Sequence, residues 1–342
     1  MSKVTIYTLA EELNMTPSMI SRAFNPNAKI SEEKRKQVLE TAEKYNFSPN
    51  KFASRLSMKT VNIGILINSR FPVSTEQMQF GIKEAYAKLK DYKINYEINL
   101  MNPEKNSFLD YESALKKFKK YDGIILTGMS SQKYTNIINE LYENNEKIVQ
   151  VQAINNNANY LFASKHNEDV AANLATDFLY QSLKNNQRKN ILLFTGNLES
   201  SLHSSAKKHF ERACEKSGLN ILECIDMKDD EVYFSKILSD IFEKHTSEID
   251  GIYITSGFSA PLCKYLEDNK IDISFVSFDT HETVKSYINK GVISATISQD
   301  VSKQMENAFE LLVKHLITGE KTPKTIYTDV HLVLKSNIQQ FR

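Results

Sequence analysis

The chain runs twice through the same alternation of short apolar strands and amphipathic helices, first over residues 61–151 and again over residues 190–278. A short string marks both copies, because Asp-Gly-Ile-Ile-Leu at 122–126 returns as Asp-Gly-Ile-Tyr-Ile at 250–254. Strands that alternate with helices predict parallel sheets covered on both faces. We therefore expect an α/β fold with two doubly wound parallel-sheet subdomains, and a ligand cleft at the carboxyl ends of their strands.

Each half has its own predicted set of elements. In the first half we expect strands at 61–67, 94–98, 123–126 and 147–151, with helices at 76–90, 107–119 and 131–144. In the second half we expect strands at 190–194, 221–225, 250–254 and 274–278, with helices at 204–217 and 231–245.

The first 60 residues differ from this body, because they contain no glycine and their pattern predicts helices alone. Thr5 is expected to cap a helix that runs to about Leu13. Thr16 and Pro17 are typical of the start of a second helix, which we expect to end near Asn25. A third helix is predicted from Ser31 to about residue 45, burying Val38, Leu39, Ala42 and Tyr45.

Two short helices joined by a tight turn and supported by a third predict a small all-α helix-turn-helix domain. In such a domain Met19, Ile20 and Ala23 would face inward, and Ser18, Ser21, Arg22 and Asn25 would face outward. Residues 1–60 hold ten Lys/Arg and six Asp/Glu, whereas the rest of the chain has 33 basic and 36 acidic residues. A basic head favours DNA phosphates, although a three-helix cap without a DNA role stays open.

Several strings in this region resemble the LacI/GalR family of bacterial transcription regulators. They are Val4-Thr5-Ile6-Tyr7-Thr8-Leu9-Ala10, Ile20-Ser21-Arg22-Ala23-Phe24-Asn25, and Ser48-Pro49-Asn50 followed by Ala53 and Leu56. The resemblance implies a DNA-binding domain over residues 1–48 and a hinge over 49–60. Residues 61–342 would then form an effector-binding and dimerisation domain that resembles the type I periplasmic sugar-binding proteins.

The same resemblance implies a function. Members of the family are repressors that bind a palindromic operator in double-stranded DNA as homodimers, and a sugar or polyol effector alters that binding. We expect this chain to be a ligand-responsive, sequence-specific regulator, acting as a repressor of a carbohydrate-utilisation operon.

Candidate DNA contacts follow by position. Residues 17, 18 and 22 match the positions from which the family reads bases, and Arg22 can offer two donors to guanine. Leu56 matches the apolar wedge that the family inserts into the minor groove, although it could instead pack on the body. The full set of expected DNA contacts is Thr5, Tyr7, Thr16, Pro17, Ser18, Ser21, Arg22, Asn25, Asn50, Ala53 and Leu56.

Candidate effector contacts are expected where strands end. Asp279 follows a strand directly and could hold two sugar hydroxyls, or it could cap the next helix. Gln299 could donate and accept hydrogen bonds to a polyol, or it could bridge the hinge. Two aromatic side chains could stack on a sugar or belong to ordinary packing. The full set is Phe71, Gln152, Phe258, Asp279 and Gln299.

The chain departs from the family at two points near the cleft. The family commonly carries an arginine four residues before an aromatic residue; here that aromatic residue is Phe210 and the matching position is Ala206. An expected Asn-Asp pair is replaced by Ser256-Gly257. A neutral sugar still suits the candidate contacts, but its identity does not follow.

The resemblance also implies that the chain crosses between the two halves three times. We expect crossings near 157–162, 289–293 and 318–324. The N-subdomain would then hold about 61–158 and 292–320, and the C-subdomain about 159–291 and 321–342. A helix at 301–317 would belong to the first half and a C-terminal pair of strands to the second.

Other classes of protein are disfavoured by what the sequence lacks. Only 10 of the 342 residues are glycine, and neither a G-x-G-x-x-G nor a phosphate-binding G-x-x-x-x-G-K-[ST] string occurs. No apolar run reaches 18 residues, and the N-terminal residues lack the apolar stretch of a secretory signal. The three cysteines have no metal or redox spacing. We expect a cytoplasmic protein without a cofactor, a metal site or a membrane partner.

The sequence contains no recognisable catalytic motif either. The seven histidines form no H-x-x-x-H pair, and no G-x-S-x-G string occurs. Two alternatives to the regulator stay open: a solute-binding protein without a DNA role, and a sugar-active enzyme such as a kinase.

Overall fold

The computed structural model describes residues 4–24, 28–45, 47, 60–144, 147–245 and 247–341. Near the N-terminus lie three helices, α1 (Ile6–Glu12), α2 (Pro17–Ala23) and α3 (Glu32–Lys44). Each begins at a predicted cap, because the hydroxyl groups of Thr5, Thr16 and Ser31 accept hydrogen bonds from backbone N–H groups three residues on.

These helices share a small apolar core, made of Leu9, Ala10, Ile20, Ala23, Val38 and Ala42. The Arg35 guanidinium group donates to the carbonyl oxygens of Ala23 and Ala28, at 2.8 and 2.9 Å, and so closes the end of α2. The expected burial of Leu39 and Tyr45 is wrong, since their side chains are 44% and 38% exposed. Val38 and Ala42, one helical turn apart, already fill the inner face of α3, and Tyr45 lies beyond its end.

The described part of the body contains two six-stranded sheets. The first has the order β11-β5-β4-β3-β1-β2 and is parallel throughout. The second has the order β12-β10-β9-β8-β6-β7, and its edge strand β12 is antiparallel to β10. The strands of the first sheet are β1 (Val61–Asn68), β2 (Ile94–Met101), β3 (Gly123–Thr127), β4 (Ile148–Val151), β5 (Phe162–His166) and β11 (Thr325–Thr328). Those of the second are β6 (Asn190–Thr195), β7 (Asn220–Asp226), β8 (Gly251–Ile254), β9 (Ser274–Phe278), β10 (Ala295–Ser298) and β12 (His331–Val333).

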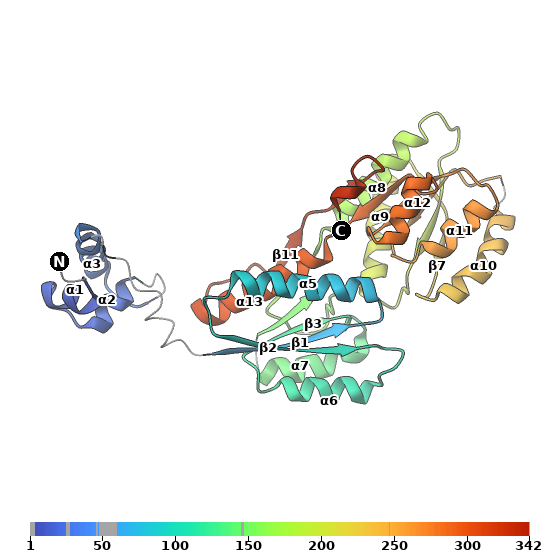
Figure 1. Ribbon diagram of the computed structural model, residues 1–342. Helices are drawn as coiled ribbons and strands as arrows, with labels where there is room; N and C mark the ends of the chain where they lie inside the picture. Colours follow the sequence, from blue (N-terminus) through green and yellow to red (C-terminus); the bar gives the residue numbers. More distant parts are fainter. Residues whose placement is uncertain are drawn as a thin grey trace.

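Helices cover both faces of the first sheet (Figure 1). On one face lie α5 (Pro72–Lys88) and α13 (Val301–Thr318), and on the other lie α6 (Phe108–Phe118), η1 (Gln132–Tyr134) and α7 (Thr135–Asn144). Successive residues of a strand point to opposite faces, so Ile65 and Ile67 of β1 pack on α5 and α13 whereas Leu66 packs toward α6. This two-sided burial explains why β1 is apolar almost throughout. We call this sheet and its helices the first lobe.

The second lobe is built in the same way. Its sheet packs on one face against α8 (Glu168–Ser182) and α9 (Ser201–Ser217). The other face packs against α10 (Glu231–Lys244), α11 (Ala260–Asp268) and α12 (Glu282–Lys290), with η2 (Ile338–Gln340) near the end of the chain. The predicted pair of α/β subdomains is therefore confirmed. No helix of the described residues is long and apolar enough to cross a membrane.

The expected crossing points between the lobes are wrong by several residues. β5 pairs with β4 in the first sheet, so the chain first crosses after His166 and not at 157–162. β10 belongs to the second sheet, so the second crossing lies near Gln299 and not at 289–293. β11 pairs with β5, so the third crossing follows Thr328 and not 318–324.

The subdomain ranges change accordingly. The first lobe contains residues 61–166 and 301–328 instead of 61–158 and 292–320, and the second contains 168–298 and 331–341. The expected C-terminal strand pair is split, with β11 in the first sheet and β12 in the second. The strands beside the crossings are short and partly polar, such as Phe-Ala-Ser-Lys-His in β5. Their hydropathy therefore gives little sign of a strand.

Candidate ligand site

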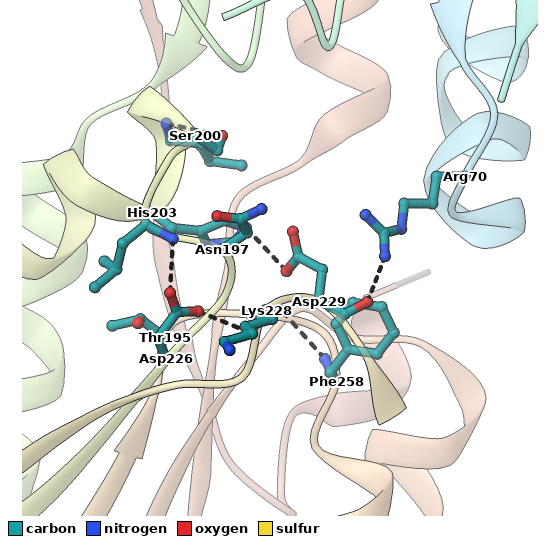
Figure 2. A network of polar contacts seen from close by, with 12 residues as sticks. Arg70, Thr195, Asn197, Ser200, His203, Asp226, Lys228, Asp229 and Phe258 are labelled. Atoms are coloured by element: carbon teal, nitrogen blue, oxygen red, sulfur yellow. Dashed lines mark hydrogen bonds and ion pairs between the residues drawn. The ribbon is translucent and has the colours of Figure 1, made fainter. Parts of the chain in front are cut away.

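The two lobes touch each other across a cleft. The Arg70 guanidinium group, just after β1, donates to the backbone carbonyl of Asp229 in the second lobe at 2.6 Å. Figure 2 shows Arg70 reaching toward the loop that carries this carbonyl. Beside it, the rings of Phe71 and Phe258 meet edge to face with their centroids 5.1 Å apart. These contacts join the β1–α5 loop to the β7–α10 and β8–α11 loops.

A cavity of about 440 Å³ opens beside these contacts. Both lobes line it, with Arg70, Phe71, Pro72 and Glu104 from the first and Asp229, Asp230, Glu231 and Phe258 from the second. It lies at the carboxyl ends of the strands, where parallel sheets bind ligands. Phe71 and Phe258, both predicted to line the cleft, come together here. Phe71 occupies the position just before α5 and not a strand end.

The loop between β7 and α10 has a tightly fixed backbone. Lys228 and Asp229 both adopt left-handed conformations, with φ of 54° and 52°. Asp226 accepts a hydrogen bond from the Lys228 N–H at 2.7 Å, and Asp230 caps α10 by accepting from two backbone N–H groups. These bonds hold the loop so that the Asp229 carbonyl faces Arg70.

Behind this loop, Asp229 lies against His203 at the start of α9. The two side chains are each 9% exposed, and His203 Nε2 lies 3.5 Å from Asp229 Oδ1. Burial lowers the pKa of the imidazole, which is therefore neutral at pH 7, and the nearby Asp229 opposes this shift. Asp229 Oδ1 and His203 Nδ1 have no hydrogen-bond partner among the described residues. A Cβ at Gly196 would lie 2.3 Å from both side chains, so only glycine fits there.

Asp279 and Gln299 form a second polar group, which does not line the cavity in the described part of the chain. Gln299 Nε2 donates to Asp279 Oδ1 at 2.9 Å. The Gln299 carbonyl accepts from Gln304 Nε2 at 2.8 Å and from Thr328 Oγ1 at 3.3 Å. The side chain of Gln299 thus lies buried at the crossings, as the hinge alternative predicts.

Asp279 is not a helix cap, because α12 begins after His281, whose Nε2 lies 2.9 Å from the Gly257 carbonyl oxygen. Burial raises the pKa of the Asp279 carboxyl group, and the hydrogen bond from Gln299 opposes that shift. Its Oδ2 lies 3.4 Å from the place of a Cβ on Gly257, next to Phe258. Asp279 therefore stands close to the second-lobe wall of the cleft.

Comparison with protein families identifies this architecture. The family model described as the periplasmic binding protein domain matches residues 67–321, well over half of the chain. The chain belongs to the periplasmic binding protein domain family.

The chain is also similar in sequence to proteins whose names are known. Catabolite control protein A of Priestia megaterium is 28% identical over 237 residues, which cover 68% of each chain. The protein of the same name from Staphylococcus xylosus is 31% identical over 140 residues, 40% of this chain and 41% of that one. This chain is homologous to these proteins.

Solved structures show the same fold. A glucose-galactose binding protein, GanP from Geobacillus stearothermophilus, superposes with a TM-score of 0.72 at 20% identity, over 82% of this chain and 99% of that one. A structure described as a LacI transcriptional regulator, from Bacteroides fragilis, gives a TM-score of 0.71 at 21% identity, over 83% of this chain and the whole of that one.

The remaining candidate ligand residue of the periplasmic binding protein domain is Gln152, at the end of β4. Its backbone is left-handed, with φ of 64°, and its N–H donates to the Ser164 carbonyl at 3.0 Å. It does not line the cavity described above. The structure therefore brings together two pairs of the five predicted residues and leaves Gln152 apart from the cavity.

Sequence reasoning missed the charged residues of the cavity lining, which are Arg70, Glu104, Asp229, Asp230 and Glu231. The run Asp229-Asp230-Glu231, which begins three residues after the end of β7, was a signal for the acidic residues of the second lobe only. Among the described residues, no cluster of three or more His, Cys, Asp or Glu side chains could hold a metal ion.

Ahead of the periplasmic binding protein domain, the predicted DNA contacts fall into three groups. Tyr7, Ser18, Ser21 and Arg22 are exposed on α1 and α2, with Tyr7 70% exposed. Three more lie at helix starts, where Thr5 and Thr16 cap the helices and Pro17 occupies the first helical position. Asn25, Asn50, Ala53 and Leu56 lie outside the described residues.

Proposed function

We propose that this protein is a ligand-responsive, sequence-specific DNA-binding regulator that represses a carbohydrate-utilisation operon. One observation carries the proposal: a three-helix unit with its own apolar core precedes a periplasmic binding protein domain. Ligand binding by the periplasmic binding protein domain does not require such a unit, whereas a regulator requires both a DNA-binding and a ligand-binding part. Homology to catabolite control protein A supports the combination.

In this proposal α2 is the recognition helix of a helix-turn-helix. Ile20 and Ala23 anchor it to the core of the head, so the exposed Ser18, Ser21 and Arg22 are free to enter a major groove. A guanidinium group can donate two hydrogen bonds to guanine O6 and N7. Arg22 is therefore the residue that we expect to carry most of the base-specific binding.

We propose that the operator is palindromic and the protein a homodimer, because one head offers one recognition helix and a two-fold dimer reads two half-sites. The helix near residues 76–90 and the region around 251–270 are the proposed interface. Exposed apolar side chains on α5 support this, since Val73, Phe80 and Tyr86 are each at least 40% exposed.

We place the effector, a sugar or polyol, in the cavity between the lobes. It would change operator affinity by favouring one arrangement of the lobes over another, since a ligand shifts an equilibrium only through its different affinities for the two states. Leu56, in the proposed hinge, would act as a wedge in the minor groove and transmit that change to DNA.

One alternative has an observation in its favour. The fold is shared with proteins such as the glucose-galactose binding protein of Geobacillus stearothermophilus, so the chain could bind a solute without any role at DNA. The three-helix head is what argues for the regulator.

The test is operator binding. Fluorescence anisotropy would compare the promoter DNA upstream of the gene itself with a scrambled duplex, with and without sugars. We expect tighter binding to the promoter, and Arg22→Ala should weaken that binding by about 1–3 kcal/mol in each half-site, which amounts to about 30-fold or more for a dimer on two half-sites.

The matched control is Lys44→Ala, which also removes one exposed positive charge from the head. Any effect of this control should be the same on both duplexes, because a contact to phosphate carries no sequence information. Equal affinity of the unaltered protein for the promoter and the scrambled duplex would contradict the proposal.

A further inference from the structure

The hydrogen bond from Arg70 to the Asp229 carbonyl lies far from the points where the chain crosses between the lobes. The crossings follow β5, β10 and β11, which lie at or near one end of their sheets, whereas β1 and β7 lie toward the other end. Three steps in the strand order separate β1 from β5, which amounts to about 14 Å at the usual spacing of about 4.8 Å. Rotation of the lobes about the crossings therefore separates Arg70 from Asp229 more than it separates residues near the crossings.

A small rotation is enough to break this bond. Arg70 Nη2 lies 2.6 Å from the carbonyl oxygen, and a hydrogen bond of this kind needs a separation below about 3.2 Å. A rotation of about 10° moves a group that lies about 14 Å from the axis by about 2.4 Å. The bond is thus present in this arrangement of the lobes and absent from a slightly more open one.

Other contacts between the lobes are weaker than this one. The hydroxyl groups of Ser130 and Ser200 lie 3.3 Å apart, and Ser201 Oγ donates to the Ile154 carbonyl at 2.7 Å. Both contacts join neutral groups, whereas Arg70 carries a charge, and a charge-assisted hydrogen bond is roughly twice as strong as a neutral one. Arg70 is therefore the polar contact whose loss should change the arrangement of the lobes most.

Both partners of the bond are held in position. Glu104 forms an ion pair with Arg70 at 3.1 Å and orients the guanidinium group, which remains 23% exposed. On the other side, Lys228 and Asp229 place the carbonyl through two consecutive left-handed conformations. Such conformations destabilise a chain of non-glycine residues, and they gather at clamps and switch regions. Because the acceptor is a backbone carbonyl, the bond does not depend on the charge of the Asp229 side chain.

Arg70 is also joined directly to the helix proposed as the dimer contact. Phe71 is the N-cap residue of α5, and Pro72 is its first helical residue. A displacement of Arg70 therefore reaches the start of α5 through two residues. Val73 and Phe80 of that helix are 46% and 40% exposed, on the surface where we place the second subunit.

We propose that Arg70 is a latch between the lobes, and that its bond to the Asp229 carbonyl couples the opening of the cleft to the position of α5. While the bond is made, the β1–α5 loop is fixed against the second lobe. When it breaks, the lobes separate and the start of α5 is released. The effect on operator binding rests on the proposed function, whereas the latch itself rests on the contacts between the lobes alone.

A distance between two spin labels, measured by pulsed electron paramagnetic resonance on the full chain, tests the latch. The labels are attached through Lys117→Cys in α6 and Lys236→Cys in α10, both at exposed positions. Cys224, which is half-buried, is replaced by serine, while Cys214 and Cys263 are buried. We expect Arg70→Ala to raise the ratio of long to short distances tenfold or more.

The matched control is Arg188→Ala. The Arg188 guanidinium group donates to the Ser247 carbonyl at 2.5 Å, a bond of the same kind that lies wholly within the second lobe. Its removal should leave the distances unchanged. A thermal melt checks folding, and Arg70→Gln, whose side chain is shorter and uncharged, should repeat the shift if Arg70→Ala does not fold. A folded Arg70 variant with the distances of the unaltered protein would overturn the latch.

Operator binding, measured on the same samples, separates this inference from the proposed function. Longer distances in Arg70→Ala without any change in promoter affinity would support the latch and count against control of DNA binding by the lobes. Promoter-specific binding together with unchanged distances in Arg70→Ala would support the regulator and overturn the latch.

Discussion

At the scale of single residues, a buried histidine marks the first crossing between the lobes. His166, the last residue of β5, is 3% exposed, and its ring packs against Phe278 with the centroids 5.7 Å apart. Burial lowers the pKa of this imidazole to about 4. The folded protein therefore holds His166 neutral at pH values where the unfolded chain would protonate it.

This gives a pH-dependent stability with a definite sign. The unfolded histidine has a pKa of about 6.5, so the unfolded state binds more protons at acidic pH and stability rises with pH. The stabilisation that comes from keeping His166 neutral is fully present above pH 6.5. It is lost as the pH falls toward 4, and the free energy of unfolding decreases by about 3 kcal/mol. Urea unfolding across this window should show the loss, and His166→Gln should reduce it.

The control for this prediction is His331→Gln, at an exposed position of β12. It should follow the pH profile of the unaltered protein. If the pH profile of His166→Gln coincided with the profiles of the unaltered protein and of His331→Gln, His166 would not be the titrating group. His203 shifts in the same direction, so some pH dependence should survive in the variant.

Single residues also show how far sequence can predict this site. Phe71 and Phe258 are predicted because each follows a predicted strand, and the structure brings their rings together at the cleft. The bond between Arg70 and Asp229 joins residues 159 positions apart and depends on a left-handed loop, which no local pattern encodes. Gln299 was ambiguous, because a buried amide at a crossing and one in a binding site look alike in sequence.

At the scale of elements, α5 and α13 of the first lobe lie side by side and share a long interface (Figure 1). Gly81 makes this possible, because a Cβ there would lie 2.1 Å from the backbone carbonyl oxygen of Ser302. At the same interface Glu306 forms ion pairs with Lys88 and with Lys303, the latter at 2.9 Å.

Gly81→Ala should therefore force the two helices apart. We expect a loss of about 3 kcal/mol in the free energy of unfolding, at the upper end of the usual cost of overpacking. Gly218→Ala is the comparison: nothing lies within 4 Å of its added Cβ, and φ is 77°. The strain of an alanine in this left-handed conformation should lower the free energy of unfolding by about 1 kcal/mol. Urea midpoints that rank the two variants in the opposite order would contradict this account of the interface.

Most elements were predictable, and the exceptions have a common cause. The start of α2 follows from Thr16 and Pro17, and β1 follows from its apolar run. The strands beside the crossings, such as β5 and β11, were missed or assigned to the wrong lobe. β5 belongs to the first sheet through its pairing with β4, but its polar sequence hides the strand. β11 is placed there by its pairing with β5, and pairing over 160 residues leaves no local signal.

At the scale of the whole molecule, the proposed switch couples the cleft to DNA. A coupling of about 1–3 kcal/mol would change operator affinity about 5–150-fold, and the operator must change effector affinity by the same factor. Asp279→Asn should weaken the response of operator affinity to the effector while leaving affinity without effector nearly unchanged, because Asp279 lies beside Gly257 at the second-lobe wall of the cleft and bonds to Gln299 at a crossing between the lobes. Asparagine is chosen because φ at this position is 67°.

Anisotropy titrations of operator, repeated at rising effector concentration, measure this coupling. The effector affinity measured with and without operator gives the same factor independently. A folded Asp279→Asn variant that still responds as the unaltered protein does would show that Asp279 takes no part in the coupling.

The order of segments along the chain has a consequence for synthesis. The core of the first lobe needs Met305, Phe309 and Leu312 from α13, and its sheet ends with β11, both of which follow most of the second lobe in sequence. A chain emerging from the ribosome therefore carries an unfinished first lobe, with one apolar face of its sheet covered by α5 alone, while almost all of the second lobe is translated. That interval is when the nascent chain is most exposed to aggregation and most in need of a chaperone.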